Sequence, residues 1–117
     1  MVEKFNTILQ EIEKTKGKVN LLALLKMDEL TDKWTVILSA SWIIEGDAEI
    51  FKYVVESIKK GISAEEMATI ARIGLFKKSE RLVELLLRYN VGAHIVNEQI
   101  NGNLIHDGYI VASNPVA

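Results

Sequence analysis

Two histidines and two carboxylates near the carboxyl end of the chain are the residues whose types and spacing are best suited to chemistry. They are His94, Glu98, His106 and Asp107, and an Asn101-Gly102 dipeptide lies between the first two and the last two. Asn-Gly is a strong signal for a β-hairpin turn, and side chains opposite each other on paired strands come within about 5 Å. Imidazole and carboxylate groups at that separation can bind a metal ion or exchange protons.

Whether these groups converge depends on the register of the hairpin. A two-residue loop places Asn97 opposite His106, whereas a three-residue loop that includes Asn103 places Glu98 opposite His106. We expect the three-residue loop, since it gathers apolar side chains on one face, namely Val96, Ile100, Leu104 and Ile110. That register also places His94 on the face of Glu98 and His106. We still predict no metal or cofactor, because Ile and Val residues surround the histidines and a Glu opposite a His is an ordinary cross-strand pair.

Ser39 and Ser41 form a second candidate site within residues 34–44. Their small hydroxyl-bearing side chains share one face of an expected strand and could seat a ligand. No Gly-x-Ser-x-Gly or Ser-x-x-Lys motif surrounds either serine, so we expect no nucleophile there. The candidate ligand-binding residues are therefore Ser39, Ser41, His94, Glu98 and His106, and none is predicted to be catalytic.

A third group of polar residues, Glu45, Asp47 and Glu49, follows the expected strand. Carboxylates at the end of a strand can hold Mg²⁺. Acidic residues are also common at the first turn of a helix, where they cap backbone amides and interact with the helix dipole. We expect the second role, because the next residues have helical spacing.

The elements that must position these residues begin with residues 34–44. Trp34, Val36, Leu38, Ala40, Trp42 and Ile44 alternate with other residues, and this pattern predicts a strand with one apolar face that carries both tryptophans. The Leu-rich residues 19–27 fit a strand or a helix. We prefer a strand that forms a hairpin with residues 34–44 through the polar connection 28–33.

Helical spacing of apolar residues predicts helices on both sides of this hairpin. Gly17 can end the first helix, and Asp47 and Gly61 can cap and end the second. A further helix is expected over residues 79–90, with Ser79 as its cap.

Residues 63–76 decide between two folds. Ser63 and Glu66 fit a capping box, which predicts a short helix, but residues 69–76 can continue that helix or form a strand. A strand would join the two hairpins in one sheet. The prediction is then an α+β domain in the order α-ββ-α-β-α-ββ, with helices on one face of a mostly antiparallel sheet made of two hairpins plus a middle strand.

A helix over residues 64–73 would instead give a winged-helix nucleic-acid-binding protein, with residues 79–90 as the recognition helix and the Asn101-Gly102 hairpin as the wing. Residues 52–88 carry eight basic and five acidic side chains, which is mildly favourable. Residues 89–117, the expected wing, contain no Lys or Arg and could not neutralise phosphate. Nucleic acid is therefore a disfavoured partner.

Composition limits the remaining classes. The 117 residues fit one domain, the net charge is -2, and there is no cysteine for disulfides or thiolate chemistry. The longest apolar stretch, residues 34–44, is too short to span a bilayer, so we expect a cytoplasmic protein without a membrane partner.

Helices on one face would leave apolar side chains such as Ile37 and Ile43 uncovered on the other. We therefore expect a homodimer, and a non-catalytic binding or regulatory domain that acts through self-association and contacts with a protein or an unidentified small ligand. A winged-helix protein is the alternative, and a small metal-dependent enzyme that uses the hairpin histidines is the third hypothesis.

Overall fold

The computed structural model describes residues 1–27 and 32–116. Its helices and strands follow the predicted order, with a short helix between the second helix and the middle strand. The elements are α1 (Val2–Lys16), β1 (Leu21–Met27), β2 (Trp34–Ser39), α2 (Ala48–Gly61), α3 (Ala64–Met67), β3 (Ile70–Phe76), α4 (Arg81–Leu86), β4 (His94–Ile100) and β5 (Asn103–Ser113). The expected connection at residues 28–33 lies mostly outside the described residues. The α+β class is confirmed.

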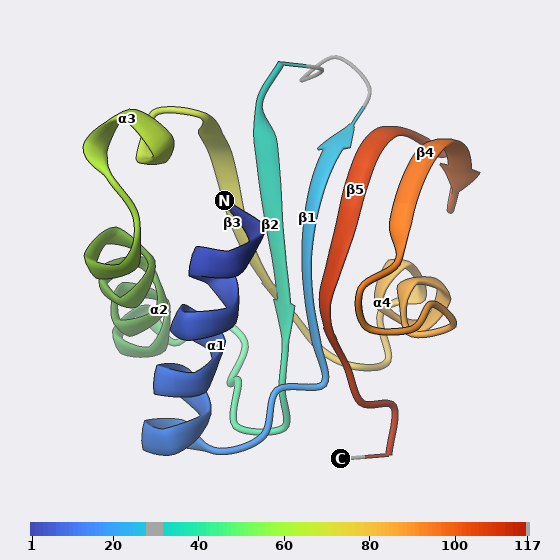
Figure 1. Cartoon of the computed structure of the whole chain (residues 1–117). Coiled ribbons are helices and arrows are strands. Elements are labelled where there is room, and N and C mark those ends of the chain that lie inside the picture. Colours follow the sequence, from blue (N-terminus) through green and yellow to red (C-terminus); the bar gives the residue numbers. More distant parts are fainter. Residues whose placement is uncertain (28–31, 117) are drawn as a thin grey trace.

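The strands form one five-stranded mixed sheet in the order β3-β2-β1-β5-β4 (Figure 1). Strand β1 pairs antiparallel with both β2 and β5, and β4 pairs antiparallel with β5. Strand β3 pairs parallel with β2. The sheet is therefore mostly antiparallel, as predicted.

Residues 70–76 form strand β3 and do not continue helix α3. In register with β2, Ile73 lies opposite Val36 and Leu75 lies opposite Leu38. These cross-strand apolar contacts explain why the segment prefers a strand. Because β3 separates α3 from α4, the helix-turn-helix of the winged-helix alternative is not formed.

Strand β2 ends at Ser39, five residues earlier than predicted. Trp42 follows a turn and donates its indole N–H toward the carbonyls of Gly17 and Lys18, at 3.2 and 3.1 Å. It therefore covers the carboxyl end of α1, and the expectation that Trp42 belongs to the strand is wrong, although both tryptophans pack against the cluster of α1 and α2. A buried indole needs an acceptor, and the chain beyond α1 supplies it.

Helices cover both faces of the sheet, and this corrects the expectation of helices on one face. Alternate residues of β1 enter two different clusters: Leu22 and Leu24 pack with α1 and α2, whereas Leu21, Ala23 and Leu25 pack with α4. Figure 1 shows α1 and α2 together on one side of the molecule and α4 on the other. A strand buried on both faces needs apolar residues at consecutive positions, which explains the Leu run of β1.

Helix α4 is shorter than the predicted residues 79–90. It begins after Glu80, which makes no side-chain capping bond, so Ser79 is not the cap. Past its end, the Ser113 hydroxyl lies 2.8 Å from the Tyr89 carbonyl and 3.3 Å from the Leu87 carbonyl. This contact from β5 offers a hydrogen bond to carbonyls that a longer helix would have used itself.

None of the helices in residues 1–27 and 32–116 has the length and apolar character needed to cross a membrane.

Candidate functional site

The β4–β5 hairpin has the two-residue loop, and the expected three-residue loop is wrong. Ile100 pairs with Asn103 and Glu98 pairs with Ile105, so Asn101 and Gly102 alone form the turn. Their φ values are 52° and 79°. A type I′ turn requires positive φ at both central residues, and its twist matches the right-handed twist of the paired strands. This local geometry, and not the apolar pattern of the strands, sets the register.

An irregularity within this hairpin changes which residues share a face. Asn97 has a positive φ of 49°, and the pairing of β5 with β1 shifts by one residue between Asp107 and Ile105, at His106. As a consequence Ile95 and Ile100, five residues apart, both pack in the cluster under α4. Residues before and after Asn97 therefore do not follow one alternation.

The predicted cluster of His94, Glu98 and His106 does not form. Glu98 accepts a short hydrogen bond from the Tyr89 hydroxyl, on the side of the sheet that α4 covers. The hydrogen bond to Glu98 raises the pKa of the Tyr89 hydroxyl, and partial burial and the negative charge of Glu98 add to the shift. His94 bonds to Asp107 instead, on the opposite side.

The described residues contain no group of three or more His, Asp or Glu side chains placed to hold a metal ion. Of the acidic group after β2, Asp47 accepts hydrogen bonds from the backbone amides of Glu49 and Ile50 at the start of α2. Glu45 lies 3.2 Å from the Lys77 ammonium. These contacts give the two carboxylates capping and ion-pair roles.

Ser39 and Ser41 do not share a surface. Ser39 is fully buried, and its hydroxyl has no hydrogen-bond partner among residues 1–27 and 32–116. Ser41 is exposed in the turn that follows β2. Ile37, which we expected at an open face, is 1% exposed under the α4 cluster. A ligand site on this side of the sheet would therefore need α4 to move.

The register of the sheet brings a different set of side chains together on the side that carries α1 and α2. Lys26 lies directly opposite Asp107, and Leu24 lies opposite Tyr109. Tyr109 pairs with His94, and Asp107 pairs with Val96. With Trp34, these residues form what we call the cross-strand ladder: Lys26, Trp34, His94, Val96, Asp107 and Tyr109.

Five members of the ladder, all except Val96, contact one another through their side chains. The His94 and Tyr109 rings stack with centroids 4.4 Å apart and planes 4° apart, and the Trp34 ring lies 6.0 Å from Tyr109. The Lys26 ammonium lies 4.7 Å from the centre of the Trp34 ring. His94 Nε2 lies 2.6 Å from Asp107 Oδ1. Such stacking and cation–π contacts orient the side chains on the sheet.

The ladder is open to solvent. Val96 is 53% exposed, and the side chains of His94 and Asp107 are 49% and 34% exposed. Lys26, Trp34 and Tyr109 are partly exposed. The surface therefore offers aromatic rings, an aliphatic side chain and charges of both signs to a partner.

A histidine paired with a carboxylate can act as a base in catalysis. Within the part of the chain that the structure describes, no serine or threonine hydroxyl bonds to His94 or Asp107. The Tyr109 ring stacks on one face of the His94 imidazole, while Nε2 in the ring plane lies beside Asp107 Oδ1.

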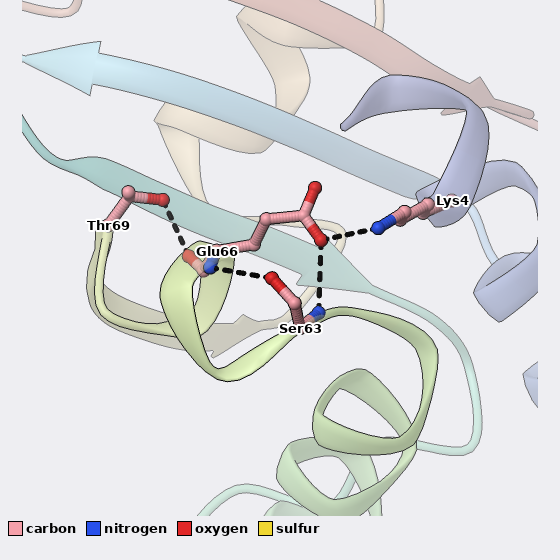
Figure 2. A network of polar contacts seen from close by, with 4 residues as sticks. All are labelled: Lys4, Ser63, Glu66 and Thr69. Carbon is pink, nitrogen blue, oxygen red and sulfur yellow. Dashed lines mark hydrogen bonds and ion pairs between the residues drawn. The ribbon is translucent and has the colours of Figure 1, made fainter.

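A second polar network lies between α1 and α3 (Figure 2). Ser63 and Glu66 form the predicted capping box, and Glu66 Oε1 also lies 2.6 Å from the Lys4 ammonium of α1. The Thr69 hydroxyl donates to the Glu66 carbonyl. The hydrogen bond from Lys4 and those from Ser63 lower the Glu66 pKa to about 2. This network ties the covering helix α1 to the segment that enters β3.

The sequence pattern singles out two ladder members, His94 and Asp107, but does not show their pairing or the positions of Lys26, Trp34 and Tyr109 beside them. A signal was present: Lys26 interrupts an otherwise apolar strand with a charge, on the parity of Leu22 and Leu24. Only the strand order shows that this charge lies beside β5.

Comparisons with protein-family models, with curated proteins and with solved structures find no match.

Proposed function

We propose that this chain is a non-catalytic binding domain that contacts a protein surface through the cross-strand ladder. The observation that carries the proposal is the ladder itself, in which five solvent-accessible side chains from four strands of one sheet contact one another and Val96 lies beside them in register with Asp107. Aromatic residues in protein interfaces supply a large apolar area together with polar atoms that bond at the rim. A cytoplasmic location is part of this proposal.

The chemistry of the ladder favours protein over nucleic acid. Asp107 lies among its aromatic rings, and the net charge of the chain is -2. A surface that binds single-stranded nucleic acid combines stacking with an excess of cations along the backbone path. The ladder offers Lys26 and the carboxylate-paired His94 instead.

Hydroxyl-radical footprinting tests the proposal. We would compare the purified chain at low concentration, the same chain at high concentration, and the chain added to extract of its source cells. We expect protection of Trp34 and Tyr109 at high concentration or in extract, while Trp42 and Tyr53, outside the ladder, keep their oxidation rates. Equal oxidation of Trp34 and Tyr109 in all three samples would refute the proposal.

A matched pair of variants makes the result specific. Val96→Asp adds a charge in the middle of the ladder, and Val91→Asp adds one at a residue that is also well exposed, at 61%, before β4. Protection should be lost with the first variant and kept with the second.

A further inference from the structure

We propose that the occupant of the cross-strand ladder is a second copy of this chain, related by a two-fold axis that places Lys26 of each copy against Asp107 of the other. This inference rests on the proposed function, because it assigns a partner to the same surface. It moves the expected dimer contact away from Ile37, which α4 already buries.

The charges of the ladder carry the argument. Lys26 and Asp107 are directly opposite in the pairing of β1 with β5, yet they do not form an ion pair with each other. The Lys26 ammonium lies over Trp34, and Asp107 Oδ1 lies beside His94. Among residues 1–27 and 32–116, no carboxylate bonds to the Lys26 ammonium, which lies at the solvent-accessible surface of the sheet.

A neighbouring cation and anion suit an interface with a two-fold axis. In an isologous interface each contact occurs twice, so a cation and an anion that lie side by side near the axis each meet the opposite charge of the other copy. A partner surface of one sign would attract one of these groups and repel the other. Neighbouring charges of opposite sign are therefore complementary to their own two-fold image.

The apolar members of the ladder fit the same arrangement. Val96, at 53% exposure, pairs with Asp107, and Trp34 lies on the opposite side of Lys26. They therefore flank the two charges along the row of neighbouring strands. Packing of one sheet on another brings such side chains into contact at a separation of about 10 Å between sheets. The apolar side chains would then shield the ion pairs from water, as they do at the centre of protein interfaces.

Sedimentation equilibrium of charge-exchanged variants tests the pairing between copies. We expect a concentration-dependent dimer for the unmodified chain. Lys26→Asp and Asp107→Lys should each weaken dimerisation at least tenfold, since each creates two pairs of like charges across the axis. Lys52→Asp, an exposed charge reversal on α2, is the matched control and should leave the dissociation constant within twofold.

Mixing the two weakened variants separates contacts between copies from contacts within one copy. A Lys26→Asp chain carries two acids and an Asp107→Lys chain carries two bases, so their equimolar mixture should form a heterodimer with unlike charges on both sides of the axis. The double variant Lys26→Asp/Asp107→Lys should dimerise with itself. Recovery in the mixture cannot arise from pairing inside a single chain.

Three results would overturn the inference: an unmodified chain that stays monomeric at millimolar concentration, single variants that dimerise like the unmodified chain, or a mixture that stays monomeric. Circular dichroism verifies that each variant is folded. If Asp107→Lys does not fold, Val96→Asp replaces it, which keeps the His94–Asp107 bond and should also abolish the dimer. A monomer whose ladder is protected in cell extract would refute the self-pairing while leaving the binding function intact.

Discussion

One side of the sheet has two halves that differ in cover and in chemistry, although the same strands run through both. In β1, Leu22 and Leu24 lie under the cluster of α1 and α2, and Lys26, next on the same parity, belongs to the open ladder. In β2, Leu38 and Val36 are buried, and Trp34 is partly exposed.

The change along each strand from aliphatic residues to charged and aromatic ones marks where the helical cover ends. Aliphatic side chains stabilise a fold in proportion to the area they lose from water, so they belong where α1 and α2 remove water. Amphipathic side chains keep a polar end hydrated and can cover a sheet that has no further layer. The comparison predicts that the covered half determines stability and the open half determines association.

The largest expected effect is in the covered half. Leu24 is fully buried, so Leu24→Ala should lower the free energy of unfolding by about 2–5 kcal/mol through lost burial and a residual cavity. Lys26→Ala, two residues along on the same parity, should lower it by less than about 1 kcal/mol. Urea denaturation measures both, and similar losses for the two variants would break the comparison.

The face under α4 should behave like the covered half. An added Cβ at Gly108 would lie 2.8 Å from Leu25 Cδ2 and 3.3 Å from Ile105 Cγ2, so we expect Gly108→Ala to cost about 1–3 kcal/mol. The cost should shrink when Leu25→Ala is already present, because the two side chains compete for one space. A full, additive cost in the double variant would contradict this packing explanation.

Stability should respond weakly to changes in the open half. His94→Ala removes the ring stacked on Tyr109 and the bond to Asp107, and we expect a loss of about 0.2–1 kcal/mol. His94→Phe keeps a ring for stacking and should recover part of that loss. If His94→Ala cost as much as Leu24→Ala in thermal or urea unfolding, the ladder would be a structural core element.

The smallest effect concerns the contact that holds the cover in place. The Glu66 pKa is about 2 in the folded protein against 4.5 for a free side chain, so the ionised carboxylate favours folding. Its contribution is complete above about pH 4.5 and is lost as the pH falls toward 2. The unfolding free energy of the unmodified chain should therefore fall more steeply over that interval than that of Glu66→Gln.

Lys4→Ala removes the ion-pair partner of Glu66 and is the matched control for this pH dependence. It should give an acid dependence between those of the unmodified chain and Glu66→Gln, because the hydrogen bonds from Ser63 remain. Parallel acid dependences for all three proteins would show that this network does not titrate with folding. The side chains of Lys4 and Glu66 are 50% and 27% exposed, and solvent therefore screens the pair.

The sequence pattern predicted correctly those features that depend on interactions between residues close in the chain. The Asp47 cap and the capping box of Ser63 and Glu66 depend on contacts within a few residues, and the structure confirms both. The predicted order of elements is confirmed as well, but its strand at residues 70–76 depends on pairing with the distant β2. The length of α4 was not predictable in this way, because Ser113 lies beside the Leu87 and Tyr89 carbonyls from 24 and more residues away.

The candidate site shows the same division more sharply. The positive φ at Asn97 and the extra residue at His106 change which side chains share a face of the sheet. A prediction from strict alternation of side chains along a strand includes neither irregularity. Glu98 consequently bonds to Tyr89, and His94 bonds to Asp107. The predicted ligand-binding set therefore separated into unrelated contacts.

By itself the sequence determined the helix caps at Asp47 and Ser63, the hairpin around Asn101-Gly102 and the apolar character of β1, because these follow from local propensity and burial pattern. The tertiary structure alone decided that α4 covers the face beside Ile37 and that Lys26, Trp34, Asp107 and Tyr109 become neighbours. The physical reason is that the strand order and register bring together residues about 80 positions apart in the sequence. Interactions between residues close in the sequence do not determine such pairings.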